Sequence, residues 1–175
     1  IMKKIILFLM LLGLQLQAFQ ATGLSVLYSD AFDGDSFYDT QDGKKATVTF
    51  EHFRTFDYGD FYMFVDVTNG KYNDNRHTDI YGEFGPRISF SKVTGKDLSV
   101  GIIKDISIAT QLNKSFDNGD HYKAYLYGIG LDFTLPGFNN FSVNTYRKDI
   151  HDDFKTEDTY QVTVVYGIKE FYGVK

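Results

Sequence analysis

Apolar and polar residues alternate one by one along most of this chain, and this pattern constrains the fold more than any other feature. Near the end of the sequence, for example, Tyr160, Val162 and Val164 alternate with Gln161 and Thr163. A period of two is typical of a β-strand with two different faces, because successive side chains of a strand point to opposite sides. No convincing helical period is found after residue 18. The alternation therefore predicts an all-β fold.

Eight such segments are separated by clusters of Gly, Asp, Asn and Pro, which favour turns. We expect strands at 23–32, 45–56, 61–68, 79–91, 98–112, 121–135, 140–148 and 159–168. A long polar loop is expected at 69–77, a turn at 92–96, and a bulge or bend at Gly85 and Pro86. The alternation loses its phase near Phe53 and Pro86, so the facing of side chains is not assigned there.

The aromatic content points to a membrane. The chain has 17 Phe and 13 Tyr in 175 residues, and many of them stand near the ends of the expected strands. A transmembrane barrel places aromatic girdles at both interfaces, with one face of each strand in lipid and the other in the lumen. We therefore predict an antiparallel up-and-down transmembrane β-barrel. A soluble periplasmic barrel or sandwich has the same period and stays open as an alternative.

The first residues have the parts of a secretory signal peptide. Lys3 and Lys4 precede the apolar run 5–14, and Ala18 supplies a small residue for cleavage. Ten apolar residues are too few to span a membrane as a helix, although an N-terminal anchor helix is the alternative interpretation. We expect residues 1–18 to be the signal peptide, with Ala21 as a second cleavage position, and residues 19–175 to form the barrel domain.

Several classes of protein are excluded. The formal net charge is −5 and basic clusters are absent from the sequence, which argues against nucleic-acid binding. Without cysteine the chain has no lipid-modified N-terminal cysteine. There is no Gly-x-Ser-x-Gly motif, phosphate-binding loop or histidine pair at metal-ligand spacing. We therefore expect no enzyme activity, no catalytic residue, no metal site and no cofactor.

Several segments carry a family resemblance. They are TFEHF (49–53) with FVDVTN (64–69), IYGEFGPRIS (80–89), TGKDLS (94–99), LYGIGLD (126–132) with LPGF (135–138), and FSVNTY (141–146). In this order they resemble the Tsx family of nucleoside-specific channels, which includes the OmpK-type outer-membrane proteins. The likeness extends from Gly23 to Tyr166.

The resemblance implies a monomeric barrel of twelve strands in the Gram-negative outer membrane, surrounded by lipid, that takes up nucleosides passively. It also implies attachment of phage or colicin to some members. The alternative function is a barrel with a structural or surface-receptor role and no conductance. The sequence shows eight strands and ends in Lys175 rather than in an aromatic residue, so we expect a truncated chain that lacks the C-terminal part of the barrel.

A nucleoside conduit needs aromatic rings for the base and polar groups for the ribose. Charged side chains are costly on the lipid face, so the acidic and basic residues within strands are expected to face the lumen. The candidate substrate-binding residues are Glu51, Phe64, Asp66, Tyr81, Glu83, Arg87 and Asp132. A purely structural carboxylate–arginine pair, and a girdle or rim position for Phe64 and Tyr81, are the alternatives. In the expected strand at 140–148, Asn144 and Tyr146 lie on one face and Arg147 lies on the opposite face. We therefore expect either the first two residues or Arg147 to lie near a rim of the barrel.

Overall fold

The computed structural model describes residues 19–30, 43–72, 75–116, 122–152 and 156–169, which form one eight-stranded sheet. Each strand pairs antiparallel with the next strand along the chain. The strands are β1 (Gln20–Ser29), β2 (Lys45–Phe56), β3 (Gly59–Tyr72), β4 (Asn75–Ser89), β5 (Ile103–Ser115), β6 (Lys123–Phe133), β7 (Phe138–His151) and β8 (Thr156–Ile168). The predicted all-β, up-and-down antiparallel fold is confirmed. The predicted signal peptide lies outside the described residues.

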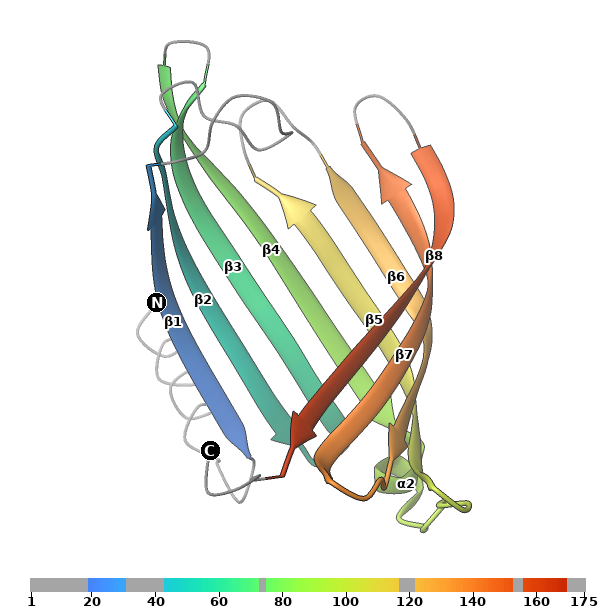
Figure 1. Ribbon diagram of the computed structural model, residues 1–175. Helices are drawn as coiled ribbons and strands as arrows, with labels where there is room; N and C mark the ends of the chain where they lie inside the picture. Colours follow the sequence, from blue (N-terminus) through green and yellow to red (C-terminus); the bar gives the residue numbers. More distant parts are fainter. Residues whose placement is uncertain (1–18, 31–42, 73–74, 117–121, 153–155, 170–175) are drawn as a thin grey trace, which may run out of the picture.

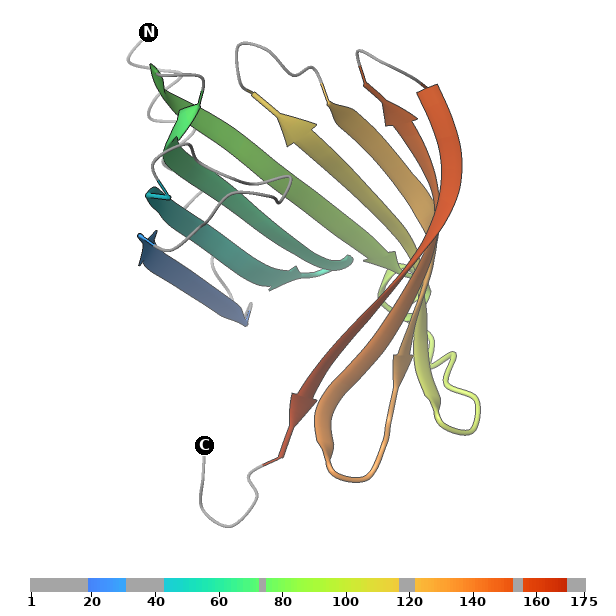
Figure 2. The same cartoon turned by 45° about the horizontal axis from the view of Figure 1, so that its top comes forward.

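The sheet curls into a half-barrel. Figures 1 and 2 show the strands tilted side by side, with β6, β7 and β8 turning round to face β1 to β3 across an open trough. Within the part of the chain that the structure describes, β1 and β8 are the two edges and do not pair with each other. The sheet therefore has a convex outer face, a concave inner face and two edges.

The convex face is apolar and exposed. On β6, Tyr125, Tyr127 and Ile129 are 45%, 44% and 54% exposed. The same face continues over both edges of the sheet, with Leu24, Val26, Val48, Phe50, Tyr160, Val162 and Val164. A soluble monomer rarely exposes an apolar surface that is continuous over a whole sheet, whereas the lipid-facing side of a barrel requires one.

The concave face is where the side chains of different strands meet. Leu126 and Tyr146 are 2% and 5% exposed, and Ala109 and Ala124 are fully covered. Polar residues are buried on this face too, among them Ser107, Asn113, Ser142 and Asn144. A polar inner face beneath an apolar outer face is the arrangement of a barrel that encloses water.

One expectation about β3 and β4 is wrong. The segment 69–77 is not a long loop, because β3 extends to Tyr72, β4 starts at Asn75, and these two residues are paired in the same ladder as the rest of the strands. At Gly85 and Pro86 the register between β4 and its two neighbours is the same before and after, so no extra residue is inserted, and the ladder with β5 skips both positions. Pairing, rather than local composition, decides where these strands end.

The phase of the alternation is also unbroken at Phe53, which stands opposite Ala21 on β1 and Tyr62 on β3. Register shifts occur instead between Ile103 and Asp105, and between Phe138 and Asn140. Both lie at the same end of the sheet as the predicted turn at 92–96.

That predicted turn is a short helix, α2 (Phe90–Thr94). The Ser89 hydroxyl accepts a hydrogen bond from the Lys92 amide at 3.0 Å, and Gly95 ends the helix with φ of 67°. Serine at the N-cap and glycine in the left-handed conformation at the C-terminus are common helix boundaries, which the strand-based interpretation overlooked. None of the helices among the described residues has the length and apolar character needed to cross a membrane.

Candidate functional site: the concave face of the half-barrel

An arginine bridges four strands across the concave face. Arg87 on β4 donates two hydrogen bonds of 2.8 Å to the carboxylate of Asp60 on β3. Its Nη1 donates to Asp132 Oδ1 on β6 at 2.8 Å and to Asn144 Oδ1 on β7 at 3.4 Å. Ser142 adds a hydroxyl that donates to the same Asp132 oxygen at 2.6 Å. We call Arg87, Asp60, Asp132 and Asn144 the arginine bridge.

The bridge passes over β5 because the residues beneath it are small. Ala109 on β5 stands directly opposite Arg87 and is fully covered. On β6, a Cβ added at Gly130 would lie 2.5 Å from Asn144 Oδ1 and 3.5 Å from Arg87 Nη1. A larger residue at either position would occupy the path of the guanidinium group. Small side chains on β5 and β6 thus allow a long one on β4 to reach β6 and β7.

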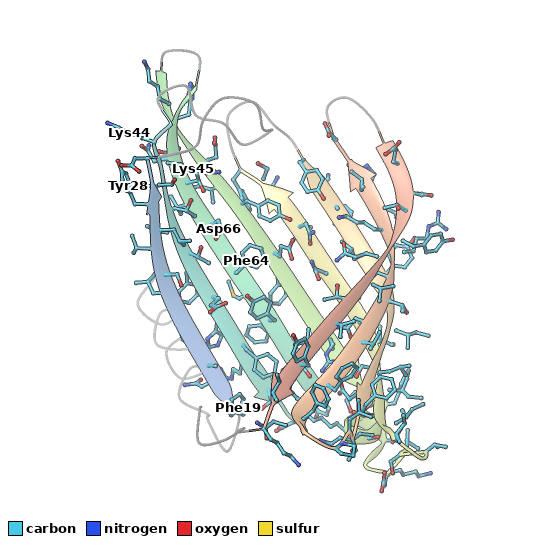
Figure 3. All side chains as sticks on the ribbon, in the orientation of Figure 1. Phe19, Tyr28, Lys44, Lys45, Phe64 and Asp66 are labelled. Carbon is cyan, nitrogen blue, oxygen red and sulfur yellow. The ribbon has the colours of Figure 1, made fainter. Side chains whose placement is uncertain are left out.

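A row of aromatic rings crosses the same face at another level. The ring centroids of Tyr62 and Phe64 are 6.2 Å apart, those of Phe64 and Tyr81 are 5.9 Å apart, and those of Tyr81 and Tyr122 are 6.4 Å apart. These residues come from β3, β4 and the residue before β6, and we call them the aromatic row. Figure 3 shows Phe64 and Asp66 on the concave side of β3. The row offers flat apolar surfaces in series.

Carboxylates are interleaved with the aromatic row. Tyr62 donates to Glu51 at 2.9 Å, and Tyr81 donates to Glu83 at 2.6 Å. Glu83 also accepts from Gln111 Nε2 at 2.7 Å. Beside Phe64, Asp66 accepts a hydrogen bond of 2.6 Å from the Thr49 hydroxyl. An ionised carboxylate has about four acceptor sites, so each of these groups retains sites for further donors.

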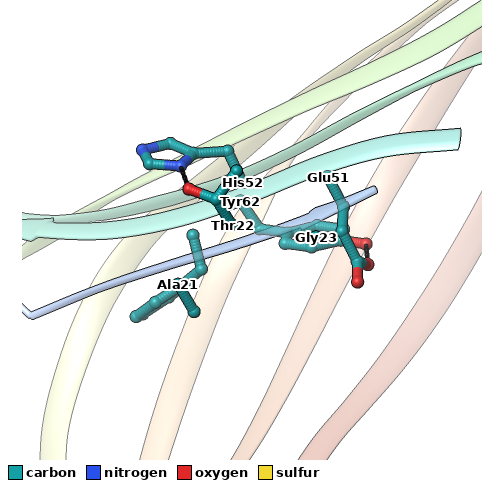
Figure 4. A pocket seen from close by; sticks show the side chains of 7 residues that line it. Ala21, Thr22, Gly23, Glu51, His52 and Tyr62 are labelled. Carbon is teal, nitrogen blue, oxygen red and sulfur yellow. Dashed lines mark hydrogen bonds between the residues drawn. The ribbon is translucent and has the colours of Figure 1, made fainter. Parts of the chain in front are cut away.

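A small hollow lies at one end of this region, beside the edge strand β1 (Figure 4). It is lined by Ala21, Thr22, Gly23, Glu51, His52, Phe53 and Tyr62. Gly23 makes room for the carboxylate, because a Cβ there would lie 2.5 Å from Glu51 Oε1. On the other face of the same strands, the Thr22 hydroxyl and His52 Nδ1 are 2.8 Å apart. The hollow is thus bordered by polar groups on an edge of the described sheet.

All seven candidate residues lie on the concave face, and the structure divides them between two groups. The candidates around the aromatic row are Glu51, Phe64, Asp66, Tyr81 and Glu83, whereas Arg87 and Asp132 belong to the arginine bridge. In the bridge the guanidinium group is saturated by protein acceptors, which favours the structural interpretation of these two residues. Asn144 and Tyr146 face inward, and Arg147 lies on the outer face near the end of β7.

The sequence interpretation missed Asp60 as a site residue, because it placed residues 57–60 between the expected strands at 45–56 and 61–68. The structure starts β3 at Gly59, so Asp60 is already in the strand and opposite Arg87. The period of two was the available signal, since Asp60, Tyr62, Phe64 and Asp66 are at alternate positions. Gln111 and Tyr122 were also missed, and their contact with the site depends on pairing between β4, β5 and β6.

Together, a curled antiparallel sheet, an apolar aromatic outer face and a polar inner face are the features of a transmembrane β-barrel. Residues 29–174 match the family model described as "Nucleoside-specific channel-forming protein, Tsx". The chain therefore belongs to the Tsx family of channel-forming outer-membrane proteins, and the resemblance found in the sequence is confirmed. This family is not a family of enzymes.

Curated relatives agree with this assignment. The chain is 34% identical over 101 residues to outer membrane protein OmpK of Vibrio parahaemolyticus serotype O3:K6, covering 50% of this chain and 36% of the relative. It is 31% identical over 113 residues to the nucleoside-specific channel-forming protein Tsx of Salmonella typhimurium, covering 58% of this chain and 39% of the relative. The chain thus spans less than half the length of these relatives. No solved structure was found to match it.

Proposed function

We propose that the protein forms a channel for the passive uptake of nucleosides across the outer membrane. The observation that carries this proposal is the aromatic row with its interleaved carboxylates on the concave face. A nucleoside joins a flat base, which stacks on aromatic rings, to a ribose whose hydroxyls donate hydrogen bonds. The row and the carboxylates offer these two kinds of contact side by side.

The expected binding is weak, as a channel requires. Stacking of a base on an aromatic side chain contributes about 1–3 kcal/mol in nucleic-acid binders. Several such contacts in series favour entry, and none of them is strong enough to prevent release. The ring spacings of 5.9 to 6.4 Å allow a solute to pass from one ring to the next.

The proposal includes closure of the sheet into a ring. In hydrocarbon every backbone amide and carbonyl must be paired, so edges such as those of β1 and β8 need partner strands. Eight strands close around an interior that side chains just fill, whereas a conduit needs a wider ring. We propose a monomeric ring of twelve strands, surrounded by outer-membrane lipid, in which residues 19–175 supply part of the barrel. Export by a signal peptide at residues 1–18 belongs to the same proposal.

The test is conductance of the full-length protein in a planar lipid bilayer, with adenosine or thymidine added. We expect ionic current that nucleosides block. Phe64→Ala removes one of the two middle rings of the row, and we expect a rise in the blocking concentration of roughly fivefold to 150-fold, from the 1–3 kcal/mol of one stacking contact. Phe61→Ala is the matched control, because Phe61 lies on the outer face of the same strand and contacts the Phe84 ring.

Each outcome has a distinct meaning. A current that is insensitive to nucleosides at high concentration refutes the proposed substrate. Absence of any current in a correctly folded protein favours the non-conducting receptor function, to which phage or colicin would attach. Equal block of wild type and Phe64→Ala would show that the aromatic row does not bind the solute.

A further inference from the structure

The outer face of the sheet is largely apolar, and at one end it carries a row of basic side chains. Lys114 on β5 pairs directly with Lys123 on β6, and Lys123 pairs with His151 on β7. Lys114 is the penultimate residue of β5, Lys123 is the first of β6, and His151 is the last of β7. All three therefore stand at one end of the sheet (Figure 1).

These side chains point to the lipid side. They are in phase with the exposed residues Ile108 and Tyr125, while their neighbours Asn113 and Ala124 are buried on the concave side. Aromatic rings accompany them on the outer face. Lys114 Nζ lies 5.0 Å from the centroid of the Phe116 ring, and Lys123 Nζ lies 5.6 Å from that of Tyr125. The ammonium groups thus stand among the rings of an interfacial girdle.

The two lysines have no anionic partner within the part of the chain that the structure describes. Asp149 and Asp158 lie on the same face of β7 and β8, and both of them pair with Arg147. Asp149 also accepts a hydrogen bond of 3.3 Å from Tyr127. Like charges directly opposite each other on antiparallel strands destabilise a sheet. An anion outside the protein would offset this repulsion.

The position of the row indicates which anion is available. Barrels of this class carry their longer loops on the cell surface. The longest connection between consecutive strands, residues 30–44, joins β1 and β2 at the same end as the row. The basic row is therefore expected at the level of the outer-leaflet headgroups, where the lipid carries phosphate groups.

The residue of β4 beside the row is a glycine. Gly82 on β4 stands directly opposite Lys114 on the outer face and offers no side chain there. Its position is flanked by backbone and by Val65, since an added Cβ would lie 3.2 Å from Phe64 O and 3.4 Å from Val65 Cγ2. The neighbouring strand therefore presents no long side chain directly opposite Lys114.

We propose that Lys114, Lys123 and His151 bind the phosphate groups of an outer-leaflet glycolipid. The two ammonium groups supply charge and several N–H donors, and the exposed imidazole supplies one more. The acyl chains then lie along the apolar outer face of β5 and β6, beside Ile108 and Ile129. This site is independent of the solute that the lumen carries, so its test does not depend on the proposed nucleoside function.

The test uses the full-length protein in detergent micelles, titrated with lipid A that carries two phosphates. Binding is measured from the rise in the apparent melting temperature, followed by heat-modifiable gel migration. We compare wild type with the double variant Lys114→Gln/Lys123→Gln. The matched control is Lys96→Gln/Lys104→Gln, which removes the same charge at the opposite end of the sheet.

We expect the dissociation constant for lipid A to rise about fivefold for each lysine removed, the usual effect of one basic side chain at an anionic membrane surface. Wild type and the control should bind equally, and Lys114→Arg/Lys123→Arg should retain binding because it keeps both charges. Dephosphorylated lipid A and inorganic phosphate alone should produce no shift. Equal affinity of wild type and Lys114→Gln/Lys123→Gln, or equal binding of dephosphorylated lipid A, would overturn the proposal.

Discussion

Replacing Arg87 by Met tests the arginine bridge, because it removes the guanidinium group and keeps most of the volume of the side chain. Two carboxylates then remain on the concave face without their shared cation. Breaking a buried ion pair by removing one partner costs about 3–5 kcal/mol. The side chains of Arg87, Asp60 and Asp132 are 13%, 17% and 24% exposed, so water in the lumen solvates the remaining charges in part. We therefore expect a loss of about 3 kcal/mol, at the lower end of that range.

The assay is urea unfolding of the full-length protein in lipid vesicles, with the folded fraction read from heat-modifiable gel migration. With an m-value of about 2 kcal/mol/M, the expected loss lowers the urea midpoint by about 1.5 M. The gel reads the folded state directly.

The triple variant Asp60→Asn/Arg87→Met/Asp132→Asn separates unpaired charge from lost packing. It removes both carboxylate charges together with the cation, so we expect it to recover more than half of the stability that Arg87→Met loses. The reasoning would be refuted if Arg87→Met unfolded at the midpoint of wild type. It would equally be refuted if the triple variant were no more stable than the single variant.

Two further predictions concern the faces of the sheet. Gly130→Ala should destabilise the protein by about 1–3 kcal/mol, because the added Cβ would lie 2.5 Å from Asn144 Oδ1. Gly85→Ala is the control, since its added Cβ has nearest contacts of 3.6 Å, and it should change the urea midpoint little. Ile129→Lys places a charge on the lipid face near the middle of the bilayer and should destabilise the folded protein by about 2–4 kcal/mol. Thr163→Lys places the same charge on the inner face and should be tolerated. Equal yields of the two variants on folding into vesicles would contradict the assigned faces.

The alternation of the sequence was sufficient for the fold class and for the facing of most side chains. The bounds of β2 agree with the expected strand at 45–56, and Tyr125 and Asp132 lie on the two faces that the pattern predicts. The reason is that a strand fixes a period of two through its own backbone, so facing is a local property. Where the pattern was weak, pairing preserves the phase, since Phe53 is paired with both neighbouring strands and Pro86 is paired with Phe61 on β3.

Local composition was misleading where it competed with pairing. Polar residues between 69 and 77 suggested a loop, yet the ladder between β3 and β4 continues through most of them, because each added pair satisfies backbone groups. Turn-forming residues around Gly59 concealed Asp60, whose role is visible only with Arg87 opposite it. The capped helix α2 was missed because its single turn is too short to show a period.

By itself, the sequence determined that this protein is a sheet with one largely apolar and one polar face, and to which face most of its residues belong. Only the tertiary structure decided which of the inward residues meet. Arg87 and Asp132 are 45 positions apart, and their contact across β5 depends on the curvature of the sheet and on small residues such as Ala109 and Gly130. Curvature and register are set by the pairing of all the strands together, so no single segment of the sequence contains them.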